Sequence, residues 1–443
     1  MQQPDDPLAK SHFEKAAGNL GWLVGERAVR FFFTVVVGFF VARHLGPERF
    51  GMLGYCLAIV TLLGIVPALG LDPVVKRELL ETPENTGAIL AGSFGLRLIG
   101  GVGAYAALLA VVLTGHGGNA EERRLLAVLG LLLFQPALLV PDLWLQAQLQ
   151  AKRSVWAQTA ALTVAAALRV VLVWRDAPLA AFAWVAVLEF ALTAAGIARL
   201  SGRSVVAWTL ASPRRREMRR LLREAWPLIF ANLAIVIYMK TDEVMLRQMA
   251  GPAAVGIYAA ATRLTEIWYF FPVALASSLL PGLLRSRRLE PAAYRLQLQR
   301  YYDLNAAIAY AISIPIALAA PWIIRVAYGA PFAGAAPIVA VHVWSSIFVF
   351  IGVARGQWLV NERLQKFYLG ATVAGAALNI LLNLCLIPRW GGVGAAVATV
   401  ISQAAAAWLS SFASDATRET GRMQTRALLL PVFGWRYLPF VSA

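Results

Sequence analysis

The sequence predicts an all-α integral membrane protein of about twelve transmembrane helices, arranged as two parallel six-helix repeats that form two lobes. The 443 residues are 59% hydrophobic and only 14% charged, and their mean hydropathy is +0.64. A chain this apolar is not solvated as a globule. Its apolar runs are also long enough to cross about 30 Å of hydrocarbon at about 1.5 Å per residue.

The apolar runs group into two sets of six. The first six spans are predicted at residues 20–44, 52–71, 87–113, 125–147, 154–174 and 178–199. The second six are predicted at residues 224–249, 255–282, 303–327, 334–358, 366–387 and 392–413. The predicted division is an N-terminal lobe (1–200), a basic linker (201–223), a C-terminal lobe (224–414) and a tail (415–443). Six prolines within the predicted spans leave backbone carbonyls without partners, and kinks are expected at these points. They are Pro136 and Pro141 in the fourth span and Pro227, Pro272, Pro315 and Pro321 in spans 7, 8 and 9.

Charge sets the predicted topology. The formal charge of +16 does not indicate nucleic-acid binding, because the basic residues recur at the ends of apolar runs and do not form one long basic face. Most of the 40 Lys and Arg fall on one side of the membrane when the spans alternate, which predicts that both termini are cytoplasmic. The linker stretch SPRRREMRRLLREAW is either an amphipathic surface helix or a plain topogenic charge run. No removable signal peptide is expected. The tail is expected to be cytoplasmic, and its last stretch, ALLLPVFGWRYLPFVSA, to lie at the membrane interface.

A weak internal repeat supports two equivalent halves. Leu45-Gly46-Pro47 to Gly51 returns as Ala250-Gly251-Pro252 to Gly256, and the stretch at 165–168 returns at 375–378. Both matches have nearly the same offset, about 205 to 210 residues, as a duplicated unit requires. Six spans per unit insert both halves in the same orientation, and transporters of this design bind their substrate between the halves.

Neither a cofactor nor a metal site is predicted. Cys56 and Cys385 both fall within apolar spans, and neither belongs to a CxxC motif or a Cys/His cluster. The sequence contains no GxxxxGK[ST] motif, so ATP-driven transport by this chain alone is not expected.

The first span carries a polar stripe. Arg27, Arg30, Thr34 and Gly38 share one helical face, with Glu26 one turn before Arg30. Two guanidinium groups on an interior face suit an anion, because Arg offers a planar donor fork to phosphate and carboxylate oxygens. In the alternative, Arg27 reaches the headgroups and Arg30 pairs with Glu26.

Spans 7 and 8, between Asn232 and Pro272, hold ionisable residues inside apolar runs. Such groups cost about 2.5 to 3.5 kcal/mol each in a lipid-spanning helix, so they normally face the protein interior or a watery cavity. Lys240 and Glu243 are at i, i+3 and can pair within the helix, whereas Asp242 projects from nearly the opposite side and needs another partner.

Arg263 and Glu266 have the same i, i+3 spacing in span 8. These two pairs can carry transport chemistry or can simply help helices to pack. Arg97 is a further deep cation in span 3, whereas Arg169 and Arg355 lie near span ends and are expected to reach the surface.

Three stretches resemble a known family. These are Leu45 to Gly51 after span 1, the run Asp242-Glu243-Val244-Met245-Leu246 continuing through Gly256 to Glu266, and the stretch from Asn379 to Ile401. Together they resemble the polysaccharide transporter branch of the multidrug/oligosaccharidyl-lipid/polysaccharide exporter superfamily, over almost the whole chain.

The resemblance implies a flippase of the bacterial inner membrane. Such a protein moves undecaprenyl-diphosphate-linked oligosaccharide from the cytoplasmic to the periplasmic leaflet by alternating access, for polysaccharide biosynthesis. The implied partners are this substrate, membrane lipids and polysaccharide polymerase machinery, without nucleic acid, and the implied state is a monomer. The family's cationic cavity is matched by five deep positions: Arg27, Arg30, Arg97, Lys240 and Arg263.

Three acids close to these cations are candidates for ion coupling, because burial and neighbouring charges can shift a carboxyl group between its two protonation states. They are Glu26, Asp242 and Glu266. An acid after Asp242 and a lysine two residues before it depart from the family pattern.

Two alternatives stay open. A small-molecule or drug exporter of the same superfamily would favour an acid-rich cavity for its cationic substrates. A membrane-embedded glycan polymerase or ligase would be an enzyme, but every predicted periplasmic connection is too short for a sizeable catalytic loop. The sequence therefore favours a transporter that is not an enzyme.

Overall fold

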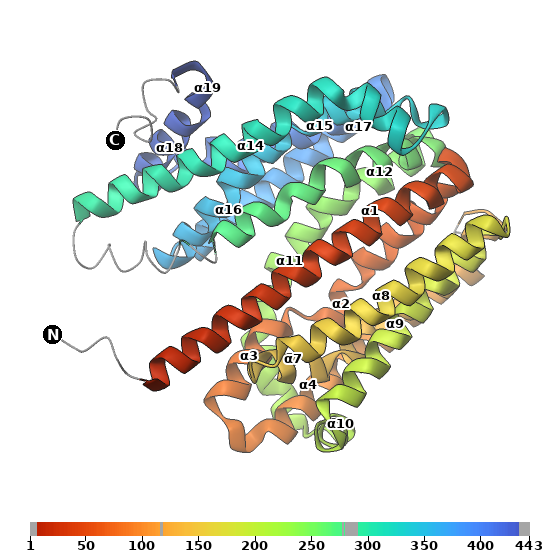
Figure 1. Cartoon of the computed structure of the whole chain (residues 1–443), viewed down its shortest axis with the longest axis vertical. Helices are drawn as coiled ribbons and strands as arrows, with labels where there is room; N and C mark the ends of the chain where they lie inside the picture. The colour runs from red at the N-terminus through yellow and green to blue at the C-terminus, as the bar shows by residue number, and fades with distance from the viewer. Residues whose placement is uncertain (1–6, 116–117, 277–278, 280–290, 434–443) are drawn as a thin grey trace. The chain divides into compact units, whose positions relative to one another are not determined.

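The computed structural model describes residues 7–115, 118–276, 279 and 291–433 (Figure 1). Of residues 7–32, 34, 227, 228, 230, 231, 291–293, 432 and 433 it describes only the helical backbone. Every regular element in these ranges is helical. The all-helical class predicted from the sequence is therefore confirmed for the described part of the chain.

The chain forms two compact units. The first contains residues 1–45 and 52–236, and the second contains residues 46–51 and 237–443. Two long helices, α1 (Pro7–Leu63) and α11 (Arg215–Ala250), contribute residues to both units. The predicted lobe limits at residues 200 and 224 differ from this boundary, and the lobe division remains a prediction.

The first unit packs its helices around an aliphatic core. Leu71, Leu79, Leu90 and Val140 are each at most 1% exposed, and Leu221 at the start of α11 joins the same cluster. The remaining elements of this unit are α2 (Ile65–Ala68), α3 (Leu71–Glu81), η1 (Pro83–Asn85), α4 (Thr86–Leu113), α5 (Ala120–Leu129), η2 (Gly130–Phe134), α6 (Gln135–Leu138), α7 (Val140–Ala147), α8 (Ala151–Trp174), α9 (Leu179–Ser201) and α10 (Arg203–Leu210).

Local sequence explains several boundaries in this unit. Asn119 caps α5 by accepting from the Glu122 amide at 2.8 Å, while the Glu122 carboxylate accepts from the Asn119 amide at 3.2 Å. This reciprocal capping box satisfies two amides that a helix start leaves free. Pro136 and Pro141 stand in the first turns of α6 and α7, so the predicted kinks divide the fourth span into α5, η2, α6 and α7.

The second unit has an aromatic-rich core. Tyr302 on α14, with Phe350, Ile351 and Leu359 on α16, is completely buried. The other elements are α12 (Pro252–Glu266), η3 (Ile267–Tyr269), α14 (Pro291–Ala327), η4 (Ala330–Phe332), α15 (Ala335–His342), α16 (Ser345–Asn361), α17 (Gln365–Ala407), η5 (Leu409–Phe412), α18 (Asp415–Leu428) and α19 (Leu430–Phe433).

The C-terminal tail begins as helix. α18 packs against α14 and buries Thr417, Thr420 and Gln424, while Arg418 remains about half exposed. The Gln424 amide donates to the Ala407 carbonyl at 3.0 Å, which ties the tail to the end of α17. Residues 434–443, the end of the predicted interfacial segment, lie outside the described residues.

Eight helical stretches in the described residues are long and apolar enough to cross a membrane. Two of them, Val35–Glu81 and Gln365–Phe412, are 47 and 48 residues long, and each reaches across parts of two predicted spans. Their chain direction changes at Gly46 and Gly391, where the backbone leaves helical geometry. The protein is therefore a multi-pass membrane protein, while the count of twelve spans remains a prediction.

The two proposed repeat corners have the same backbone conformation. Gly46 has φ 68° and ψ 172°, and Gly251 has φ 85° and ψ 175°. Each is followed by a proline that restarts a helix, and a positive φ is accessible to glycine at little cost. The equivalence supports the proposed duplication, although the arrangement of the whole chain as two repeats remains a prediction.

Candidate functional site

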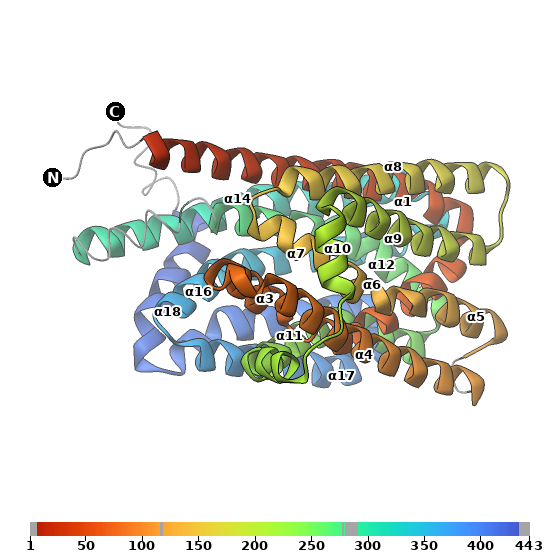
Figure 2. The ribbon, with the colours of Figure 1, turned by 90° about the horizontal axis from the view of Figure 1, so that it is seen from below.

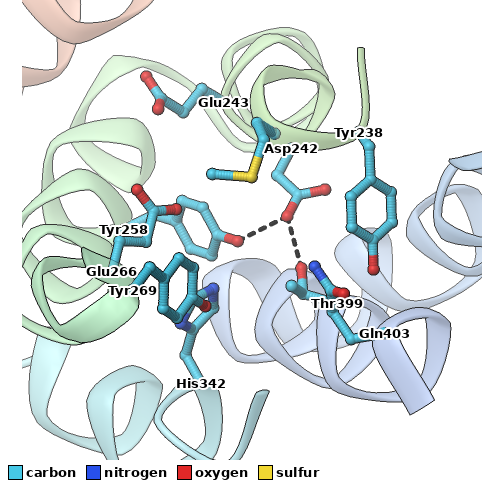
Figure 3. Close-up of a pocket in the computed structure, with 10 residues that line it drawn as sticks. Tyr238, Asp242, Glu243, Tyr258, Glu266, Tyr269, His342, Thr399 and Gln403 are labelled. Atoms are coloured by element: carbon cyan, nitrogen blue, oxygen red, sulfur yellow. Dashed lines mark hydrogen bonds between the residues drawn. The ribbon is translucent and has the colours of Figure 1, made fainter. Parts of the chain in front are cut away.

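A buried carboxylate organises the candidate site in the second unit. Asp242 on α11 is 5% exposed, and three side chains donate hydrogen bonds to it. Tyr258 on α12 and Thr399 on α17 each donate to Oδ2 at 2.6 Å, and the Asn383 amide of α17 donates to Oδ1 at 2.6 Å. Figure 3 shows Asp242 pointing between Tyr258 and Thr399, so one carboxylate joins three helices.

Among the residues whose side chains the structure describes, this carboxylate has no cationic partner. No Lys or Arg of the described residues lies within ion-pair distance of Asp242. Desolvation of a charge is expensive, and three neutral donors offset only part of the cost. The position therefore favours a proton or a small cation that neutralises the group.

A second polar atom points to the same place. Asn383 uses its amide nitrogen for Asp242 and also donates to Asn379 Oδ1 at 3.1 Å. Its own Oδ1 is buried and has no hydrogen-bond partner among the described residues. An unsatisfied buried oxygen beside a carboxylate is a ready ligand for a proton donor, a water molecule or a hard cation.

A small cavity adjoins Asp242. The space for the centre of a water-sized sphere is about 10 Å³, which suits one water molecule or ion and is far too small for a glycan. Of the described residues, three acids contribute to its wall and no Lys or Arg does. The lining residues are Tyr238, Met239, Asp242, Glu243, Tyr258, Glu266, Tyr269, His342, Thr399 and Gln403.

Several residues of this wall were not predicted from the sequence. His342 on α15 is 1% exposed, and its Nδ1 lies 2.8 Å from the Thr265 hydroxyl. The Tyr269 hydroxyl lies 2.9 Å from that of Ser345. A histidine within an apolar span is the sequence signal that could have identified His342, because buried ionisable groups in membranes are rare.

Lys240 and Glu243 form the intrahelical pair that their spacing predicts. The Lys240 ammonium donates to Glu243 Oε1 at 2.7 Å, and the side chains are 29% and 10% exposed. As predicted, Asp242 faces away from this pair and finds its partners on other helices.

Arg263 does not form the second pair that the sequence offered. Its guanidinium lies 4.7 Å from the centre of the Phe50 ring, and no ion pair joins it to Glu266 in the described residues. The interpretation of Arg263 and Glu266 as an intrahelical ion pair is therefore wrong. An aromatic face attracts a cation without neutralising it, so Arg263 retains its full charge.

The other predicted cations are placed differently. Arg97 in the first unit is 3% exposed. Its guanidinium donates to Asp72 Oδ1 at 2.5 Å and to the Pro136 carbonyl at 3.1 Å. Its charge is thus already paired. The side chains of Glu26, Arg27 and Arg30 lie outside the described residues, so their stripe on α1 remains a prediction.

Of the two arginines expected at the membrane surface, one is buried. Arg355 is 2% exposed and donates to the Ala406 carbonyl at 2.7 Å, so its expected reach to the surface is wrong. Arg169 is less deeply placed, at 23% exposed, and pairs with Glu189 at 2.7 Å.

Comparison with known proteins identifies the family of this chain. The family described as "Polysaccharide biosynthesis protein" matches residues 17–287, which is more than half of the chain. The chain belongs to this family. The matched segment includes most of α1 and all of α11 and α12, and therefore Asp242, Lys240 and Arg263.

Two curated relatives come from Haloferax volcanii, and both are named as flippases. "Probable low-salt glycan biosynthesis flippase Agl15" is 26% identical over 48% of this chain and 46% of its own length. "Probable flippase AglR" is 28% identical over 39% of this chain and 37% of its own length. The match spans less than half the length of these curated relatives.

Solved structures share the fold. The lipid II flippase MurJ, in an inward closed conformation, has a TM-score of 0.68 at 13% identity and covers 94% of this chain and 92% of its own. An inward-facing multidrug resistance MATE family transporter of the MOP superfamily has a TM-score of 0.66 at 16% identity. The match covers 94% of this chain and 96% of the transporter. The fold of this family member is therefore that of the MATE and MurJ transporters.

Proposed function

We propose that this family member is a flippase, not an enzyme, that moves a lipid-linked oligosaccharide from the cytoplasmic to the periplasmic leaflet for polysaccharide biosynthesis. The observation that carries the proposal is the family match over residues 17–287, in a chain with the fold of membrane exporters. The proposed carrier is undecaprenyl diphosphate and the proposed location is the bacterial inner membrane. The names of the two curated relatives support the flippase activity.

The physical demand of this reaction explains the buried charges. A diphosphate carries about two negative charges, and their transfer through hydrocarbon is prohibitive unless protein groups replace water. The proposed protein contacts are Arg27, Arg30, Arg97, Lys240 and Arg263. Among the three whose side chains are described, Arg97 and Lys240 have carboxylate partners, so Arg263 is the cation most free to bind a phosphate.

Alternating access would expose such a cationic site to one leaflet at a time. In the proposed cycle the diphosphate enters the polar interior while the polyprenyl tail stays in the lipid. The glycan then leaves on the opposite side, so no bond is made or broken. A monomer suffices for this cycle, and polysaccharide polymerase machinery is the proposed downstream partner.

Asp242 is the proposed coupling residue. It is buried, has no counter-ion among the described residues, and lies beside a water-sized cavity and an unsatisfied amide oxygen. Glu266 lines the same cavity and is a second candidate, whereas Glu26 rests on the sequence alone. The proposed coupling ion is a proton or sodium, and transport in controlled gradients would separate these two and distinguish both from uncoupled transport.

Export of a cationic drug is the second candidate function. The acid-lined cavity and the MATE fold favour it, but the cavity accepts one water-sized particle and is thus better suited to a coupling ion. A membrane glycan polymerase is disfavoured by the names of the relatives.

The deciding experiment reconstitutes the purified protein in proteoliposomes with an undecaprenyl-diphosphate-linked oligosaccharide. Protection of the glycan from an external glycosidase reports its leaflet, and parallel vesicles report uptake of a cationic dye. Flipping that requires the protein, without dye transport or lengthening of the glycan, is expected. Dye transport without flipping would establish the drug exporter, and glycan lengthening would establish the polymerase.

A further inference from the structure

The corner between α9 and α10 has an unusual shape. α9 ends at Ser201, Gly202 adopts φ 94°, and α10 begins at Arg203. In Figure 1 α10 is seen nearly end-on while α8 and α9 run lengthwise, and Figure 2 shows α10 crossing α9. α9 is long and apolar enough to span the membrane, so we place α10, which follows it directly, near the membrane surface at the end of that span.

One face of α10 is anchored in the first unit. Val205 and Thr209 are each 3% exposed, and the Trp208 ring lies close to Gly87 at the start of α4. The opposite face therefore turns outward. It carries Arg203, Val206, Ala207 and Leu210, at i, i+3, i+4 and i+7, and Leu210 is 62% exposed.

This outward face borders an open cavity. The cavity measures about 680 Å³ and is lined by Ala198, Arg199, Arg203, Val206 and Ala207. It combines two guanidinium groups, one from the last turn of α9 and one from the first turn of α10, with a wall of small apolar side chains. A headgroup with the beginning of an acyl chain needs this mixture of surfaces.

Both guanidinium groups are available to bind a ligand. Neither Arg199 nor Arg203 makes an ion pair or side-chain hydrogen bond with any described residue, and both are exposed. The nearby α9 carbonyl of Leu200 accepts instead from Arg153, at 3.3 Å. Two adjacent cations without carboxylates repel each other, so a shared anion between them is favourable.

We infer that this corner, formed by Arg199, Arg203, Val206 and Ala207, binds an anionic phospholipid. The two guanidinium groups hold the phosphate, and Val206 and Ala207 contact the first acyl carbons. Each basic residue near a membrane surface contributes favourably to the binding of anionic lipid, and an apolar wall selects a lipid over free phosphate. The site lies wholly within the first unit and does not depend on the proposed transport activity.

The test counts lipids retained by the purified full-length protein in native mass spectrometry. Phosphatidylglycerol and phosphatidylcholine are the probes, and inorganic phosphate is the competitor. The variant Arg199→Gln/Arg203→Gln removes both cations from the corner. The matched control Arg214→Gln/Arg216→Gln removes the same charge from exposed arginines that do not line the cavity.

The wild type is expected to retain one phosphatidylglycerol with preference over phosphatidylcholine, and the corner variant to bind it about tenfold more weakly. The control should keep the wild-type affinity. Ala207→Trp, which fills the cavity without changing charge, should weaken binding as well. Equal losses in the corner and control variants, no preference between the two lipids, or full displacement by millimolar phosphate would each overturn the inference.

Discussion

Gly51 on α1 and Gly256 on α12 pack against each other's helices at one point of closest approach. A Cβ built on Gly51 would overlap the Pro252 carbonyl oxygen, and one built on Gly256 would overlap that of Pro47. The two repeat motifs therefore meet reciprocally, each glycine against the proline of the other. Such an approach is possible only without side chains, as in other small-residue contacts between membrane helices.

The first prediction concerns this crossing. Gly51→Ala or Gly256→Ala should destabilise the protein by about 2 to 4 kcal/mol, because the obstructing atoms are backbone and cannot rotate away. Thermal unfolding of the purified proteins in detergent, followed by a signal that does not depend on cysteine labelling, measures the change in stability. Gly370→Ala on α17 is the control, since nothing lies within 4 Å of its added methyl group. Equal stability of all three variants would refute the close packing.

The second prediction concerns coupling at Asp242. Asp242→Asn should abolish the dependence of glycan flipping on the proton or sodium gradient, because the uncharged amide no longer requires a cation. Binding of the glycan lipid should survive. Glu189→Gln is the matched control, because Glu189 pairs with Arg169 in the other unit and lies outside the cavity. Unchanged gradient dependence in the Asp242 variant would exclude Asp242 as the coupling residue.

The third prediction tests the donors around that carboxylate. Thr399→Val should lower stability by about 1.5 to 3 kcal/mol, because it removes a hydrogen bond to a charged group. In the Asp242→Asn background the same change should cost clearly less, since the bond then joins neutral groups. Chemical unfolding of the four proteins gives this double-mutant cycle. Strict additivity would mean that Thr399 does not act through Asp242.

The predictable and unpredictable parts of this site differ in sequence distance. The Lys240–Glu243 pair follows from helical spacing, and the need of Asp242 for outside partners follows from its opposite projection. Asn383 and Thr399 lie 141 and 157 residues away, and helical periodicity contains no information on which residues of another helix will meet Asp242.

Arg263 illustrates the same limit. Its i, i+3 spacing to Glu266 permits a pair, but the proximity of Phe50 depends on the crossing of α1 and α12. At the level of the fold, hydropathy identifies the helices, since the membrane requires every backbone group to be paired within a helix. The positions of the corners at Gly46 and Gly251 were likewise accessible from the repeated Gly-Pro motif.

The fourth prediction concerns an ionic cluster between α3 and α11. Glu78 is 5% exposed, accepts from Arg220 at 2.7 Å and from Arg77 at 3.1 Å, and Arg77 also contacts Glu224. Glu78→Gln should destabilise the first unit by about 1.5 to 3 kcal/mol, because it removes the charge of a buried carboxylate that accepts from two arginines.

Glu81 provides the control for this cluster. It lies 3.7 Å from Arg77 but is 62% exposed, so Glu81→Gln should change stability by less than about 1 kcal/mol. Unfolding of both variants in low and high salt separates the buried from the screened contribution. Equal effects of the two substitutions would show that the cluster contributes only as a surface charge network.

The last prediction concerns the cation most free to bind substrate. Arg263 contacts the Phe50 ring and has no carboxylate partner among the described residues, so its charge is available to a diphosphate. Arg263→Lys keeps the charge and loses the planar donor fork, and should therefore retain partial flipping. Arg263→Glu replaces an attraction by a repulsion and should reduce flipping at least about a hundredfold. If the Phe50 ring does no more than position the Arg263 guanidinium, then Phe50→Leu should leave flipping largely intact. The measurement is glycan flipping in proteoliposomes, normalised to folded protein, since an uncompensated charge can also block folding. Normal flipping by well-folded Arg263→Glu protein would remove Arg263 from the substrate site.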